Sequence, residues 1–170
     1  MDSERFWQII HESRTGAGAD NPDGNMDKQI EQLTKILTRL PPEEVVDFDR
    51  HFATFMNDAY RWDLWGAAYI IGDGCSDDSF MDFRSWLISM GRDVYEKTLA
   101  EPDSLVDAAD DPTVEDCFFE EFQYVAGNVY GDDMDHSLDY PTEPAGEQWE
   151  EEGDDLRCRF PKLWARFWDD

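Results

Sequence analysis

Basic residues are scarce in this chain of 170 residues. It has 14 lysines and arginines against 41 aspartates and glutamates, which gives a formal net charge of −27. A negative field of that size repels phosphate backbones and anionic lipids at long range, so we expect no direct nucleic-acid binding and no membrane partner. A protein partner, in particular a basic one, is compatible with this charge.

Cysteine is also scarce, and the three cysteines, Cys75, Cys117 and Cys158, lie far apart without a C-x-x-C motif. An odd, scattered set of this kind argues against a disulfide framework and against a zinc site built from cysteine. The sequence has no uncharged apolar run of about 18 residues that could cross a membrane. Its opening, MDSERFWQIIHESR, lacks the apolar core of a secretory signal. These absences predict a reduced, cytoplasmic protein.

The common catalytic motifs are missing as well. The chain has no G-x-S-x-G, no P-loop, no G-x-G-x-x-G and no H-E-x-x-H. We therefore expect no cofactor, no metal site and no enzyme built on these motifs.

Aromatic and aliphatic side chains, in contrast, are abundant. Aromatics make up 14% of the chain, including seven tryptophans and 11 phenylalanines, and apolar residues make up 41%. This content is too high for a disordered protein. A chain of this length can bury about 70% of the surface that it exposes when unfolded. We expect an aromatic-rich core.

Apolar residues recur with helical spacing through the first half of the chain. The segment from Trp62 to Ile71 is apolar nearly all round, which is typical of a helix at the centre of a bundle. Trp65 and Tyr69 are expected in that core, and Trp62, flanked by charged residues at a helix break, is expected to be partly exposed. The four helices expected in this half cover residues 6–15, 30–40, 42–59 and 62–71.

A turn follows the fourth of these helices. Gly72 and Gly74 can take the positive φ that ends a helix. Ser76 is a natural N-cap for the next helix, with two aspartates in its first turn facing the positive end of the helix dipole. From there we expect one long helix to about Leu99.

A capping signal at Thr113 starts a further helical stripe from Phe118 to Val129. No heptad repeat persists, and no alternating run is long enough to require a strand. We therefore predict an all-α fold in which about six helices form a single compact orthogonal domain over residues 1–130.

The composition changes after Gly131. The next residues are acidic, contain prolines and are poor in aliphatics, which predicts a loose loop that crosses the surface. The chain then ends in an aromatic cluster, Trp164, Phe167 and Trp168. We assign residues 131–170 to an acidic loop and an aromatic C-terminal segment that docks back on the helical domain. The protein is then a monomer, or a weak dimer through these three rings.

Several motifs in residues 65–105 resemble those of an uncharacterised bacterial family, the domain of unknown function numbered 4240. They are WGAAY, GCSDD, F-x-DFR-x-WL, GR-x-x-Y and EPDSL. The resemblance covers roughly residues 1–130, and the Phe6–Trp7 opening fits it as well. Asp73 stands where the family pattern leads us to expect a second glycine. The resemblance supports a helical fold and a cytosolic bacterial protein, and it assigns no catalytic residue.

The stretch GDGCSDDSF, residues 72–80, is dense in reactive side chains. In the structural interpretation they end one helix and cap the next, with Arg84 or Arg61 pairing with the aspartates. In a sharper interpretation Cys75 is a nucleophile beside a helix N-terminus, although the adjacent aspartates disfavour its thiolate. The aspartates could also offer oxygen ligands to a metal, but their spacing is not that of a calcium loop.

Two hypotheses about function follow, from different classes. The favoured one is a protein-binding or regulatory module without catalytic activity, with Trp62, Asp77, Asp78 and Arg84 near the contact. The alternative is an enzyme of unrecognised type with a carboxylate and arginine cleft around Asp77, Asp78 and Arg84. Less favoured is an acidic mimic of nucleic acid, which would need carboxylates spaced like phosphates.

Overall fold

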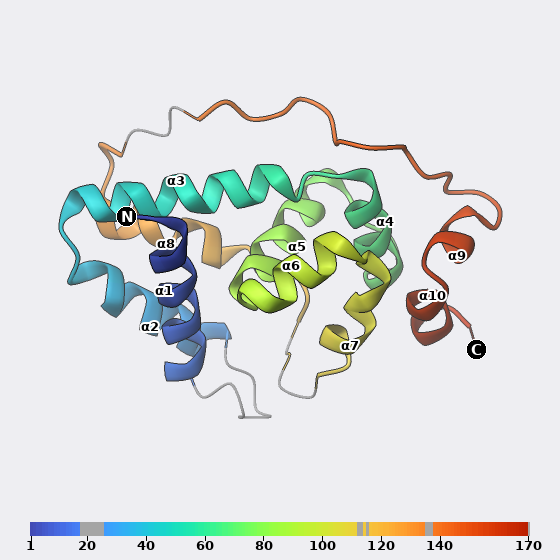
Figure 1. The fold of residues 1–170 in the computed structure, drawn as a ribbon, viewed down its shortest axis with the longest axis horizontal. Helices are drawn as coiled ribbons and strands as arrows, with labels where there is room; N and C mark the ends of the chain where they lie inside the picture. Colours follow the sequence, from blue (N-terminus) through green and yellow to red (C-terminus); the bar gives the residue numbers. More distant parts are fainter. Residues whose placement is uncertain (18–25, 112–113, 115, 135–137, 170) are drawn as a thin grey trace.

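The computed structural model of the protein describes residues 1–17, 26–111, 114, 116–134 and 138–169. Regular structure in that part of the chain is entirely helical, which confirms the all-α prediction (Figure 1). The α-helices are α1 (Ser3–Gly16), α2 (Met26–Thr38), α3 (Pro42–Asp58), α4 (Trp62–Ile71), α5 (Asp77–Ser89), α6 (Arg92–Ala100), α7 (Leu105–Ala109), α8 (Val125–Tyr130), α9 (Asp155–Arg159) and α10 (Pro161–Phe167), with 3-10 helices η1 (Pro102–Ser104) and η2 (Glu121–Tyr124). The start signal at Thr113 lies outside the described residues.

The expected number of about six helices was too low. Gly91 has a φ of +99°, a conformation that glycine adopts without strain, and it divides the expected long helix into α5 and α6. The C-terminal segment adds α9 and α10. The apolar stripe runs through the break at Gly91, so periodicity alone gave no sign of it.

One end of the molecule is built by α1, α2, α3 and α8, which pack against one another (Figure 1). Its core is aromatic, as the composition predicts. Phe6 lies 4.8 Å from Phe48 and 5.2 Å from Phe55, and Trp7 lies 4.6 Å from Phe55, measured between ring centroids. Offset and tilted ring pairs of this kind stabilise the fold beyond what the burial of the rings contributes. This packing holds α3, the longest helix, in place along one face.

The predicted turn before α5 is confirmed in its cap and in the positive φ of Gly74, but not in the positive φ expected of Gly72. The Ser76 hydroxyl accepts a hydrogen bond from the Ser79 backbone N–H at 3.1 Å, as an N-cap does. Positive φ values occur at Asp73 (+51°) and Gly74 (+113°), whereas Gly72 has a φ of −88°. Gly72 is needed for space, since a Cβ there would lie 2.8 Å from the carbonyl oxygen of Gly74.

Helix α4 packs against α5 and η1 on one side, within residues 1–130, and against α10 from the C-terminal segment. This two-sided packing explains why its sequence is apolar nearly all round. Trp65 and Tyr69, which we expected in the core, are only half-buried and pack against the core from its periphery. Their rings contact Trp62 and Trp149 there, at centroid distances of 5.1 Å and 4.9 Å respectively.

Residues 138–149, which we call the strap, run without helix over α3 towards α9 and α10 (Figure 1). The strap is fixed to the α3–α4 junction by backbone hydrogen bonds of 2.9 Å, from Ala145 N–H to Tyr60 O and from Trp62 N–H to Ala145 O. The Asn57 side chain adds a bond of 3.1 Å to the carbonyl of Asp139. The predicted surface loop is therefore tied down along α3.

Beyond the strap, the C-terminal segment contacts α4 closely. Leu156, Phe160 and Leu163 are buried, and the Trp168 indole N–H donates to the Ile70 carbonyl at 2.9 Å. None of the helices in the described ranges is long and apolar enough to cross a membrane.

Candidate binding groove

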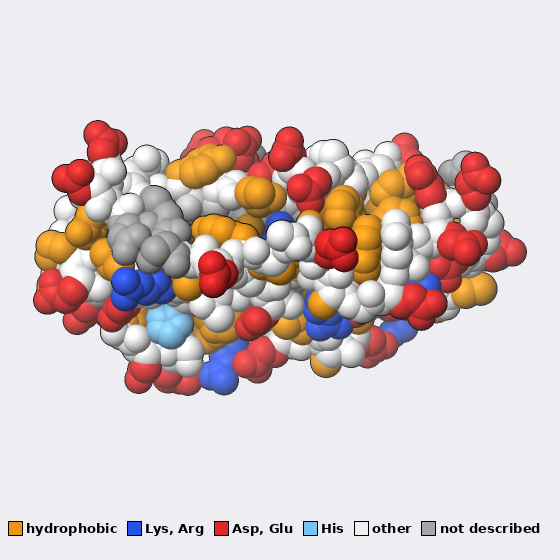
Figure 2. Space-filling view, turned by 90° about the horizontal axis from the view of Figure 1, so that it is seen from above, with side chains coloured by type: hydrophobic (Ala, Val, Ile, Leu, Met, Phe, Trp, Pro, Cys, Tyr) orange, Lys and Arg blue, Asp and Glu red, His pale blue; other side chains and the backbone are white. Residues whose placement is uncertain are grey.

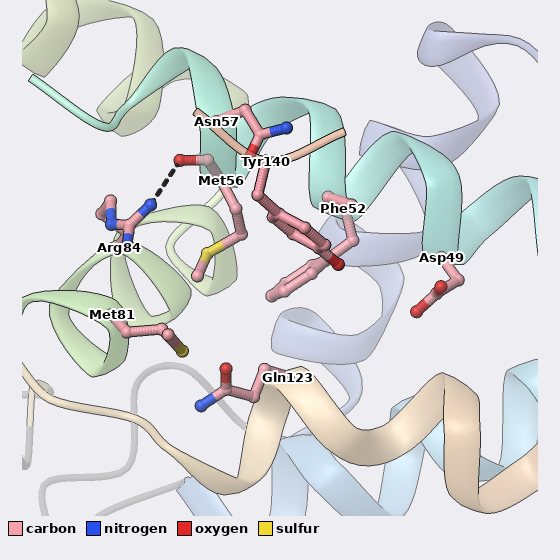
Figure 3. A pocket seen from close by; sticks show the side chains of 9 residues that line it. Asp49, Phe52, Met56, Asn57, Met81, Arg84, Gln123 and Tyr140 are labelled. Atoms are coloured by element: carbon pink, nitrogen blue, oxygen red, sulfur yellow. Dashed lines mark hydrogen bonds between the residues drawn. The ribbon is translucent and has the colours of Figure 1, made fainter. Parts of the chain in front are cut away.

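A hollow of about 360 Å³ lies between α3 and α5 (Figure 3). A second hollow of about 170 Å³ adjoins it, and the two share Asn57, Met81, Arg84 and Tyr140. We therefore treat them as one feature, the Arg84 groove. Its lining residues are Asp49, Phe52, Ala53, Met56, Asn57 and Tyr60 from α3 and the residues after it, Asp77, Met81 and Arg84 from α5, Gln123 from η2, and Tyr140 and Pro141 from the strap.

Helical spacing brings the α5 side chains to the groove together. Because Ser76 starts α5, Asp77, Met81 and Arg84 follow at intervals of four and three residues and lie along one face. The strap adds Tyr140, which is 60% exposed and lies beside Met56 and Phe52 of α3 (Figure 3). The groove thus combines local helix geometry with a contact between distant parts of the chain.

Arg84 lines both hollows of the groove and is only 7% exposed. Its Nη1 donates to the Met56 carbonyl at 2.8 Å and its Nε to the Phe80 carbonyl at 3.3 Å. Its guanidinium carbon is 4.6 Å from the ring centroid of Tyr60 and 4.9 Å from that of Phe80, distances typical of cation–π contacts. Met56 is in the last turn of α3, where a cation is favoured by the helix dipole.

Burial lowers the pKa of Arg84, and nearby Tyr60 and Asp77 oppose that shift. An arginine stays charged at neutral pH even so. The expected ion pair between this arginine and the aspartates is wrong: within the described residues, no carboxylate lies within ion-pair distance of Arg84. Arg61 instead pairs with Asp63.

Asp77 lines the second hollow and contacts Tyr60 there. The Tyr60 hydroxyl donates to the Asp77 carboxylate at a long 3.4 Å, and both residues line the second hollow. Burial first, and then the charge of Asp77, raise the pKa of Tyr60. Tyr60 therefore stands between an anion, which it contacts by its hydroxyl, and the cation of Arg84, which it contacts by its ring.

The four residues expected at the contact are only partly brought together. Asp77 and Arg84 line the same hollow. Asp78 is exposed on α5 and is not among the lining residues, and Trp62 is half-buried against Trp65 and Trp149 outside the groove. The groove itself therefore includes two of the four.

Sequence reasoning missed Met81, Gln123 and Tyr140. Met81 falls outside the apolar stripe of α5 and is 38% exposed, unlike the buried Phe80 and Phe83 beside it. An apolar residue off the stripe of an amphipathic helix was the available signal. Tyr140 stands alone among acidic residues and prolines, and nothing in its own neighbourhood indicates that it contacts α3.

The reactive groups near the turn include one thiol, that of Cys75. Burial, then the charges of Asp82 and Asp77, raise the pKa of the Cys75 thiol to about 12, with Arg84 opposing. At neutral pH that thiol carries almost no thiolate, which is the nucleophilic form. Within the described ranges, no group of three or more histidines, cysteines, aspartates and glutamates is placed to hold a metal ion.

The face over α3 and the strap exposes hydrophobic side chains among many acidic ones. Figure 2 looks down on this side of the molecule and shows several hydrophobic patches with acidic side chains between and around them. Met81 and Tyr140 are two of the large hydrophobic residues that the protein exposes.

A family model described as "Protein of unknown function (DUF4240)" matches residues 1–132. This match confirms the resemblance that we expected over residues 1–130. The strap, α9 and α10 all lie beyond the matched residues. No curated protein and no solved structure matches the chain.

Proposed function

The chain belongs to the DUF4240 family, whose description assigns no activity, and from its own groove we propose that it is a protein-binding module. The Arg84 groove takes an apolar side chain from a basic segment of a partner protein. The observation that carries this proposal is an apolar groove, open to solvent, on the surface of a chain with a net charge of −27.

The walls of the groove suit an apolar side chain. Phe52, Met56, Met81 and Tyr140 surround a hollow of about 360 Å³, within the usual range for ligand pockets. Methionine side chains are flexible and polarizable, so that a wall with two of them can adapt to different side chains. Burying one leucine side chain in such a site is worth about 1.5–3 kcal/mol.

The charge of the protein favours basic residues on either side of the apolar side chain in the partner segment. Asp77 lines the groove, and the net charge of −27 attracts lysine and arginine at long range while repelling acidic chains. Complementary charge of this kind raises association rates and discriminates against wrong partners. A basic segment with one apolar anchor therefore fits both the walls and the surroundings.

The enzyme alternative has less support in the groove. Asp77 and Arg84 do share a hollow, as that alternative requires. However, the described lining residues include no histidine, serine, cysteine or lysine, and the neighbouring thiol of Cys75 is held protonated. The side chains present are better suited to hold a ligand than to attack one.

Fluorescence anisotropy tests the proposal with a defined probe. The probe is a fluorescein-labelled peptide amide with a central leucine between lysines, and a matched peptide has glutamates in place of the lysines. We expect the lysine peptide to bind, with affinity that falls as salt is added, and the glutamate peptide not to bind. We expect Met81→Lys to weaken binding at least about tenfold, because it removes a wall and adds a repelling charge.

Tyr130→Lys is the matched control, because Tyr130 is 37% exposed, close to the 38% of Met81, and does not line the groove. It changes the net charge equally and should leave most of the affinity. Equal loss in both variants would show that charge alone, and not the groove, holds the peptide.

A further inference from the structure

Arg84 has more hydrogen-bonding capacity than the protein uses. A guanidinium has five N–H groups in a planar fork. Two of them, one on Nε and one on Nη1, donate to the carbonyls of Phe80 and Met56. The other three, on Nη1 and Nη2, have no acceptor among the described residues, although the side chain is more than nine-tenths buried.

The environment of Arg84 adds to this deficit. Neither Asp77 nor any other described carboxylate lies within ion-pair distance of its guanidinium. A buried cation without a paired anion is costly, in a protein that otherwise has a large excess of anions. The side chain lines both hollows of the groove, so its free edge is accessible to a ligand there.

From this geometry we infer that Arg84 is a receptor for the C-terminal carboxylate of a basic partner chain. The two carboxylate oxygens match the fork of the guanidinium, in the bidentate arrangement that arginine favours. The last side chain of the partner then lies against Met56, Met81 and Phe52 in the larger hollow. This inference rests on the proposed function and specifies the end of the chain that the groove takes.

A chain end fits better than an acidic side chain within a partner. The hollow that Arg84 shares with Asp77 measures about 170 Å³ and is bounded by Tyr140 and Pro141 of the strap. A carboxylate in the middle of a chain would need room for chain on both sides, whereas a terminus needs one way in. Lysines before the terminus offset the repulsion that a net charge of −27 exerts on any carboxylate.

Two peptides that differ only at the C-terminus test the inference. Each has four lysines followed by a terminal leucine and a fluorescein label at the N-terminus; one is the free acid and the other the amide. We expect the free acid to bind about tenfold more tightly or better. Net charge works in the opposite direction, because the amide carries one more positive charge, so such a preference requires a specific contact.

Arg84→Lys separates the guanidinium from simple positive charge, since lysine cannot bind a carboxylate through a planar fork. We expect this variant to lose most of the preference for the acid. Arg61→Lys, at an arginine outside the groove that pairs with Asp63, should keep it. If Arg84→Lys does not fold, the comparison of the acid and the amide on the unaltered protein still tests whether the groove binds a C-terminal carboxylate.

The outcomes separate this inference from the proposed function. Equal binding of acid and amide would overturn the inference and leave the proposed function in place. Binding of neither peptide would overturn both. A full preference for the acid in Arg84→Lys, or equally tight binding of an amide with an internal glutamate, would also overturn the inference.

Discussion

The carboxylate of Asp103 accepts the backbone N–H of Leu163 at 2.9 Å, a bond between residues 60 positions apart. It also accepts the N–H of Lys162 at 3.1 Å. These two N–H groups lie in the first turn of α10, where a helix has no acceptor of its own. A side chain of η1 thus does for α10 what an N-cap does within one helix, and it fixes the C-terminal segment on the rest of the protein.

Asp103→Ala should release α10. The change leaves two N–H groups without an acceptor in a site where Asp103 is 7% exposed and Leu163 is fully buried, and we expect a loss of about 1–3 kcal/mol in the free energy of unfolding. Urea unfolding measures the loss, and trypsin should cut earlier at Lys162 and Arg166. Asp107→Ala, which removes an exposed carboxylate paired with Lys97, should change neither quantity much.

Gly66→Ala should weaken the contact between α4 and the C-terminal segment. A Cβ at this position would lie 2.8 Å from Cε2 of Phe160, 3.1 Å from Cδ1 of Trp149 and 3.2 Å from Cδ2 of Leu156. Phe160 and Leu156 are buried and cannot move aside freely, so we expect a loss of about 1–3 kcal/mol in stability.

Gly127→Ala is the matched control for that change. Gly127 is also inside a helix, α8, and a Cβ there would meet nothing within 4 Å. Alanine is the better helix former, so the control should gain up to about 1 kcal/mol. Thermal unfolding of both variants would contradict the packing at α4 if Gly66→Ala were as stable as Gly127→Ala.

Ser76→Ala tests the start of α5. The substitution removes the acceptor of the Ser79 N–H and should cost about 0.5–2 kcal/mol. Ser76→Asp keeps an acceptor at the same place and should retain most of the stability. Chemical denaturation of the two variants gives the comparison, and equal losses would mean that the hydroxyl does not act as a cap.

Asp82→Asn should stabilise the protein at pH 7. Burial, then the charge of Glu120, raise the pKa of Asp82, whose carboxylate accepts a bond of 3.3 Å from Gln123. A folded pKa above the unfolded value means that ionisation disfavours the folded state, so the unaltered protein gains stability from this group as pH falls through the folded pKa. The advantage of the variant should therefore shrink towards about pH 4 and below.

Melting temperatures across that pH range measure the difference, with Asp132→Asn as the control. Asp132 is exposed, and its replacement makes the same change in net charge. If both variants gained equally at pH 7, the effect would come from general charge repulsion and not from the surroundings of Asp82.

Local signals made much of the fold predictable. Pro41–Pro42 separates α2 from α3, Ser76 caps α5, and the break before Trp62 lies where the sequence indicates it. Each of these depends on residues within one helical turn. Gly91 was missed because the apolar stripe continues across it, and a lone glycine in a helical pattern is more often tolerated than disruptive.

The groove could be predicted only in part, for a related reason. Asp77 and Arg84 could be singled out because they lie in or just after a stretch, residues 72–80, that is dense in reactive side chains. Their actual contacts, to Tyr60 and to the carbonyl of Met56, come from α3 and the residues that follow it, and they carry no local signature. Tyr140 reaches the groove through a strap whose anchors are backbone bonds to the α3–α4 junction, and such bonds leave no trace in sequence.

The central claim is that a basic, apolar segment binds in the Arg84 groove, and methyl NMR of methionine tests it most directly. The protein has six methionines, of which Met56 and Met81 line the groove and Met26 and Met90 do not. In protein labelled with ¹³C-methyl methionine, titration with the peptide amide that has a central leucine between lysines should shift the signals of Met56 and Met81 in a saturable way. The signals of Met26 and Met90 should stay in place. Saturable shifts confined to methionines outside the groove, or no shift at all, would contradict the account.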